Sequence, residues 1–142
     1  MNTLLILILA IIILIFIFDR KNKYEGPVKT DKVLETSSAW DNSKYFNING
    51  VPKFTVIKST ISPNSVLPWH SHHVPEIAYV ISGKLIIEKY ENETPRFLEI
   101  NKGHAFSEIV DKVHRGKTGW EGAEIVSIYI STGDQKLTTE LN

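Results

Sequence analysis

The sequence predicts an all-β fold, a single barrel of short strands preceded by one hydrophobic N-terminal helix. Three observations predict it. The length of 142 residues suits one domain, and 42% apolar residues can supply its core. No stretch after residue 18 shows sustained helical periodicity. Short apolar segments alternate with turn residues instead, which is typical of sandwiches and barrels.

An unbroken apolar run, Leu4 to Phe18, stands near the start of the chain. Its 15 residues would rise about 22 Å as a helix, slightly less than the roughly 30 Å of a bilayer core. We therefore expect residues 1–19 to be a transmembrane anchor, residues 20–36 a polar juxtamembrane linker and residues 37–142 the barrel domain. A cleaved signal segment is the alternative, although no small-residue cleavage site follows the run.

The charges of the chain bear on its location and partners. Arg20, Lys21 and Lys23 follow the apolar run, and such charges favour the cytoplasmic side for the domain. The expected location is thus the membrane, with a single pass, and a secreted or periplasmic location applies if the segment is cleaved. Lys+Arg and Asp+Glu are both 16, so no basic field attracts nucleic acid. Without cysteine, disulfides and thiolate metal sites are excluded.

The strands are expected in the following places. Alternating apolar residues around Asn49-Gly50 predict a hairpin. Even- and odd-numbered side chains of residues 54–59 should point to opposite sides of a strand. Residues 76–100 predict three strands, broken at Ser82-Gly83 and again at residues 92–95. A short strand between two turns and a strong late strand complete the pattern.

Three of the five histidines lie in the segment HSHHVPE, residues 70–76. In an extended chain, His70 and His72 project to one side and His73 projects to the other. Glu76 shares the side of His72 if the alternation continues. Two imidazoles and a carboxylate can then converge on one cation, whose identity stays open because imidazole and carboxylate suit different ions. A solvated loop is the alternative, but the apolar strand that follows favours a metal site.

This segment resembles the first motif of the cupin superfamily, His-x-His, three or four residues, Glu, six residues, Gly. The matching residues are His70, His72, Glu76 and Gly83. Residues 103–116 are similar to the second motif, with Gly103 as its leading glycine and His114 as its histidine, although the usual proline and second glycine before that histidine are absent. The resemblance covers about residues 50–131.

The resemblance implies a jelly-roll barrel of six to eight strands with a metal in its mouth. It implies one divalent transition metal, Fe, Mn, Ni, Zn or Cu, held by His70, His72, Glu76 and His114, with open positions left for water or substrate. Glu108 is a candidate catalytic residue, either orienting a ligand or carrying a proton, and a solvated strand position is its alternative. His104 is expected to be exposed.

The sequence thus predicts a membrane-tethered, metal-binding cupin that acts as a metal-dependent enzyme on a small molecule. Cupins with this ligand set include dioxygenases, isomerases and lyases, and the fold does not choose among them. A non-catalytic module that binds or senses a metal or small ligand is the alternative. The expected partners are a small-molecule ligand, the membrane and, as an open arrangement, a second copy in a homodimer.

Overall fold

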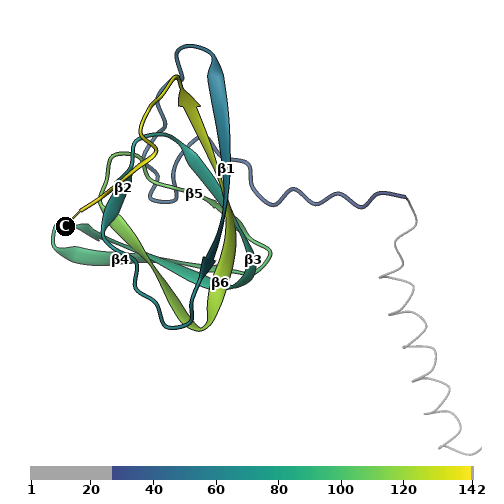
Figure 1. Cartoon of the computed structure of the whole chain (residues 1–142), viewed down its shortest axis with the longest axis vertical. Coiled ribbons are helices and arrows are strands. Elements are labelled where there is room, and N and C mark those ends of the chain that lie inside the picture. Colours follow the sequence, from purple (N-terminus) through teal and green to yellow (C-terminus); the bar gives the residue numbers. More distant parts are fainter. Residues whose placement is uncertain (1–26, 142) are drawn as a thin grey trace, which may run out of the picture. The chain divides into compact units, whose positions relative to one another are not determined.

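A computed structural model describes residues 27–141 of the chain (Figure 1). The expected anchor, residues 1–19, lies outside the described residues and stays a prediction. The chain divides into two units, Met1–Asp31 and Lys32–Asn142. The few described residues of the first unit form neither helix nor strand. Across residues 27–141, no helix has the length and apolar character needed to cross a membrane.

The second unit is built from β-strands, which confirms the all-β prediction for the described residues. They form one seven-stranded sheet that curls around a common interior (Figure 1). The strands are β1 (Pro52–Ile61), β2 (His70–His72), β3 (Glu76–Glu91), β4 (Thr94–Asn101), β5 (Ala105–Ser107), β6 (His114–Thr132) and β7 (Thr138–Glu140).

Strands β3 and β6 form the spine of the sheet. They pair antiparallel along nearly their whole length, from Glu76 opposite Tyr129 to Lys89 opposite His114. In the half of this pair that contains Glu76 and Tyr129, β5 lies beside β3 and β1 lies beside β6. Their other half is flanked by β4 on the side of β3 and by β2 on the side of β6, with β7 beyond β2. The β3–β6 ladder is therefore continuous through both flanked halves of the sheet and contributes side chains to the interior from each of them.

The spine bends where two glycines meet. The β3–β6 register shifts between Val80 and Ser82 and again between Gly83 and Leu85. Gly83 has φ +70°, and a Cβ atom there would lie 2.1 Å from the carbonyl oxygen of Gly122. Only glycine permits this approach, and register shifts of this kind bend a strand.

The bend also exchanges the face on which side chains are buried. In β3 the buried apolar residues are even-numbered before the bend, at Ala78 and Val80, and odd-numbered after it, at Leu85 and Ile87. In β6 the buried positions change in the same way, from even to odd numbers. Both halves thus face one core, whose buried cluster consists of Ile61, Ala78, Val80, Leu85, Ile87, Ile100 and Phe106.

Two predicted strand arrangements are wrong. The hairpin around Asn49-Gly50 is absent from the described residues, because β1 pairs along its whole length with the distant β6. The predicted break at Ser82-Gly83 is a bulge inside the continuous strand β3, since the glycine allows the strand to bend without ending. The predicted alternation in residues 54–59 is seen in part: Phe54 and Val56 are exposed and Thr55 and Ser59 are half-buried, but Ile57 is exposed as well.

A segment before β1, residues 38–45, packs over the end of β5, and we call it the cover segment. The backbone N–H of Trp40 donates to the carbonyl of Ser107, at 3.0 Å. The carboxylate of Asp41 accepts hydrogen bonds from Lys89 at 2.5 Å and from Lys112 at 2.9 Å. The side chains of Asp41 and Lys89 are only 2% and 4% exposed, so this ion pair is buried.

We predict that Gly83→Ala strongly destabilises the protein. The alanine would suffer about 1–2 kcal/mol from its positive φ and a further 1–3 kcal/mol or more from the clash with Gly122. Gly103→Ala is the matched control, because Gly103 also has a positive φ, +85°, but nothing lies within 4 Å of its added Cβ. Denaturant unfolding measures both, and equal losses would contradict the account of the bend.

We predict an acid-dependent stability from Asp41. Burial alone would raise its pKa, but hydrogen bonds from Lys89, Ser43 and Lys112 outweigh burial and hold the pKa well below its usual value. Because the pKa is lower in the folded state, ionised Asp41 stabilises the fold. This stabilisation is fully present above the unfolded-state pKa of about 3.9 and is lost as the pH falls below that value toward the folded-state pKa.

Asp41→Asn should therefore reduce the loss of stability between about pH 5 and pH 2. At pH 7 it should cost about 3–5 kcal/mol, because it leaves Lys89 buried without its nearest carboxylate. Asp134→Asn is the control, since Asp134 pairs with Lys53 in an exposed ion pair. Unfolding free energies across the pH range check this, and parallel profiles for Asp41→Asn and the parent would contradict it.

Candidate metal centre

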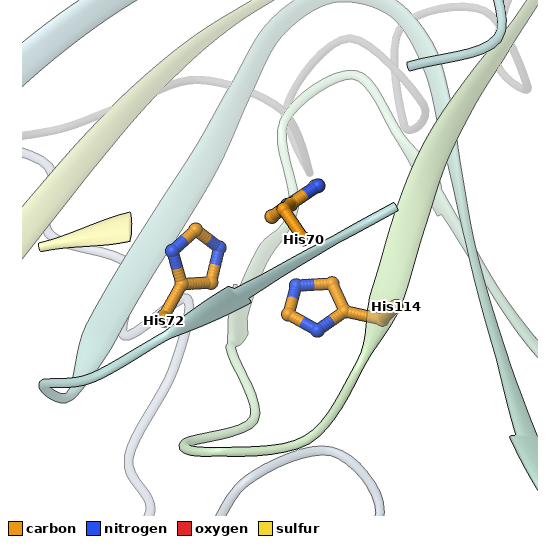
Figure 2. A group of neighbouring side chains, drawn as sticks. All are labelled: His70, His72 and His114. Atoms are coloured by element: carbon orange, nitrogen blue, oxygen red, sulfur yellow. The ribbon is translucent and has the colours of Figure 1, made fainter. Parts of the chain in front are cut away.

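Three histidines from two strands converge in the interior. His70 and His72 come from β2, and His114 begins β6, where it pairs with His70. One nitrogen from each ring lies within 4.8 Å of the others, and the ring centroids are 4.6–5.0 Å apart. Figure 2 shows the rings gathered around a common space. The cluster can hold a metal ion.

The outer nitrogen of each ring is held by a hydrogen bond. Nδ1 of His70 lies 2.8 Å from the carbonyl oxygen of Pro68, and Nδ1 of His114 lies 2.9 Å from that of Lys112. A carbonyl only accepts, so each Nδ1 carries the proton and each Nε2 keeps a free lone pair. Nδ1 of His72 bonds to the hydroxyl of Thr138 at 2.9 Å. Such contacts fix the orientation of histidines that bind metals.

Two buried polar atoms of this group have no hydrogen-bond partner, Nε2 of His114 and Oε2 of Glu76. Oε2 of Glu76 does lie 3.0 Å from Nε2 of His72, but without the alignment of a hydrogen bond. Unpartnered buried polar atoms are costly in a protein interior. Two ligand atoms that each lie about 2.1 Å from one first-row metal ion, and form a right angle at it, are also about 3 Å apart. A cation held by the three histidines would give Nε2 of His114 a partner. Glu76 is not part of that group of three, but its Oε2 lies beside it, at ligand-to-ligand distance from His72.

The electrostatics of the three histidines favour their neutral forms, which bind metals. Burial lowers the pKa of His72 to about 3, with smaller contributions from His114 and His70. Burial also lowers the pKa of His70 and of His114. The imidazoles are therefore neutral at pH 7, as coordination requires. Burial, and then the charge of Glu108, raises the pKa of Glu76 to about 7, while the hydroxyls of Ser127 and Tyr129 oppose this.

Glu108 is buried beside the histidines, so the predicted alternative of a solvated position is wrong. The cover segment explains this: Oε1 of Glu108 accepts the indole N–H of Trp40 at 3.1 Å, and it also accepts the N–H of Ile109. The same oxygen lies 3.7 Å from Nε2 of His114. Burial raises the pKa of Glu108 to about 7. No sequence signal indicated that Trp40 would cover this carboxyl group.

The two remaining histidines lie elsewhere. His73 points away from the cluster, as the alternation predicts, and both its ring nitrogens are engaged, one by Asp111 and the other by Thr139, each at 2.8 Å. His104 is exposed, and its Nδ1 lies 3.3 Å from two backbone carbonyls. Thr138 was not found from the sequence, because it lies 66 residues from its partner His72 in a strand of only three residues.

The histidine cluster opens into a pocket of about 330 Å³. Glu76, Glu108, Tyr129 and Thr138 contribute to its polar end, and its walls away from the histidines are largely apolar. The residues that line the rest of the pocket are Ser59, Ile61, Leu67, Pro68, Leu85, Ile87, Phe106, Gly116, Ile125, Ser127 and Glu140. A volume in this range accommodates a small molecule beside the candidate ligands.

Solved structures resemble this chain in fold. Oxalate decarboxylase from Bacillus subtilis matches 62% of the chain with a TM-score of 0.54 and 19% identity. Recombinant pro-11S globulin of pumpkin matches the same share with a TM-score of 0.53 and 15% identity. The chain covers only 24% and 23% of those two chains. No protein-family model and no curated protein sequence matches it.

The chain has the cupin fold. The predicted resemblance to cupins is thus confirmed at the level of fold. Among the matched structures is one concerned with the Mn(II) centres of Bacillus subtilis oxalate decarboxylase, at 20% identity. At such identities the likeness extends to the fold and not to the activity, which has to be argued from the site itself.

We predict that Thr138→Val weakens metal binding by the cluster about 10- to 100-fold, because His72 loses the hydrogen bond that orients its ring. Thr139→Val is the matched control. It removes the neighbouring hydroxyl, which bonds to His73 rather than to the cluster. Competition titration with a fluorescent zinc chelator measures both affinities. An equal effect of the two substitutions would contradict the orienting role of Thr138.

Proposed function

We propose that this cupin binds one divalent transition metal ion and acts as a metal-dependent enzyme on a small molecule. His70, His72 and His114 would hold the ion through Nε2, and Glu76 would add a carboxylate oxygen. The observation that carries the proposal is the pair of orphaned atoms, Nε2 of His114 and Oε2 of Glu76, buried beside an interior pocket. Structural metal sites are usually closed, whereas this one adjoins space for a substrate.

The identity of the ion stays open among Fe, Mn, Ni, Zn and Cu. Three imidazoles suit most of these ions, and the carboxylate also suits Mn. The likeness to oxalate decarboxylase, whose Mn(II) centres have been characterised, supports Mn as one member of this set. A bound ion would supply Lewis acidity or, if it is a redox metal, electron transfer.

The residues of the chain have distinct roles in this proposal. The backbone carbonyls of Pro68 and Lys112 hold the protons of two ring nitrogens, so the opposite nitrogens stay available. Glu108 lines the pocket with its carboxyl group beside His114. In this proposal Glu108 would exchange a proton with a bound molecule. The apolar residues of the pocket wall would limit the access of water to the reacting end.

A non-catalytic module that binds a metal or small ligand is the second candidate function. The same ligands and the same pocket would serve it, and the low identity to the matched enzymes leaves it open. Turnover separates the two. Consumption of dioxygen or conversion of a small molecule by metal-loaded protein, lost on metal removal, would support the enzyme.

We predict that His72→Ala removes most of the bound metal, because it deletes one of the three ligand nitrogens of the cluster. His73→Ala should leave the metal content unchanged, since the His73 ring nitrogens bond to Asp111 and Thr139 outside the cluster. Elemental analysis of both variants and the parent, after loading with zinc and removal of excess, gives the stoichiometry. Full zinc content in His72→Ala, or loss of zinc in His73→Ala, would show that the ligands are assigned wrongly.

A further inference from the structure

The pocket has an unusual distribution of charge. The acidic side chains that line it are Glu76, Glu108 and Glu140. Neither lysine nor arginine is among the described residues that line the pocket. Glu140, in β7 opposite His70, is exposed at the open end.

Strand alternation places nearby cations outside the pocket. Arg115 and Lys117 alternate in β6 with His114 and Gly116, so their side chains point to the other face of the strand. There both bind Glu88, Arg115 at 2.7 Å and Lys117 at 2.5 Å. One carboxylate outside the pocket thus binds both cations.

The one lysine on the inner face of β3 also forms an ion pair outside the histidine pocket. Lys89 has the same parity as the pocket residues Leu85 and Ile87, but its ammonium group binds Asp41 of the cover segment. It lines a separate pocket with Trp69 and does not line the pocket of the histidines. A negatively charged molecule in the histidine pocket would therefore meet no protein cation there.

An anionic molecule would lose its hydration on entering this pocket, and such a loss is costly without a compensating charge. A divalent ion held by one carboxylate carries a net charge of only +1, and Glu108 and Glu140 lie nearby. A dianion would therefore be poorly stabilised. Apolar walls favour apolar groups instead, and the volume of about 330 Å³ is roughly twice that of a cavity known to hold benzene, about 150 Å³.

We propose that the histidine pocket selects an uncharged, largely apolar small molecule with a hydroxyl or carbonyl oxygen for the metal, and that it discriminates against small dicarboxylates. This inference rests on the proposed metal function, because the oxygen needs the ion as its partner. The substrate class therefore differs from oxalate, the compound named in the matched decarboxylase.

The test compares catechol with phthalate on the zinc-loaded full chain at pH 7. Both carry two oxygen-bearing groups at neighbouring positions of one benzene ring, but catechol enters the pocket uncharged and releases a proton to the buffer only when its oxygen binds the ion, whereas phthalate enters as a dianion. Titration calorimetry gives each affinity, which is divided by the affinity of the same probe for free zinc. We expect the corrected affinity of catechol to exceed that of phthalate at least about 10-fold, and oxalate to follow phthalate.

A charge reversal at the open end tests the cause. Glu140→Lys should raise the affinity for phthalate about 5-fold or more and leave that for catechol within about 2-fold, because only the dianion gains from the new cation. Glu121→Lys changes the net charge equally, but Glu121 is exposed and does not line the pocket. It should change neither affinity by more than about 2-fold.

The zinc content is measured before and after each titration, so two kinds of failure are distinguishable. Protein that never holds zinc would overturn the metal function and this inference together. Protein that holds zinc but binds phthalate as tightly as catechol, or binds neither probe, would overturn the inference alone. An equal gain for phthalate in Glu121→Lys and Glu140→Lys would also overturn it.

Discussion

The close approach of Gly83 to the carbonyl of Gly122 is the constraint on which the rest of the structure depends. It lets β3 and β6 bend together without ending, so one antiparallel ladder supplies both walls of the interior. The bend also changes the parity of inward side chains in both strands. For this reason Gly116, before the bend in β6, and Tyr129, after it, both line the same pocket although one is even-numbered and the other odd-numbered.

The interior built in this way separates charges by sign. Cations near the pocket are bound outside it, Arg115 and Lys117 by Glu88, whereas the carboxyl groups of Glu76 and Glu108 are buried within it. Burial of two carboxyl groups without a protein cation beside them in the pocket is costly, and a divalent ion would reduce that cost. The free lone pairs of His70 and His114 indicate the same requirement, since backbone carbonyl groups hold their protons on the far side of each ring.

Much of this arrangement could be predicted from local sequence. Alternation alone placed His70 and His72 on one side and His73 on the other, and the glycine of the first motif, Gly83, does mark a sharp bend. The features that could not be predicted depend on residues far apart in the chain. Burial of Glu108 depends on Trp40, which lies 68 residues away in the sequence. The expected hairpin at Asn49-Gly50 does not form, because β1 pairs with the distant β6 instead. Local patterns do not encode such tertiary choices.

X-ray absorption at the zinc edge of protein loaded with one equivalent of zinc tests the central claim most directly, because it reports the ligands of the ion itself. The account predicts a first shell of nitrogen and oxygen at about 2.0–2.2 Å, with the outer scattering of about three imidazole rings. A shell of oxygen alone, without imidazole scattering, would mean that the ion binds carboxylates or water elsewhere. That result would contradict a metal centre built on His70, His72 and His114.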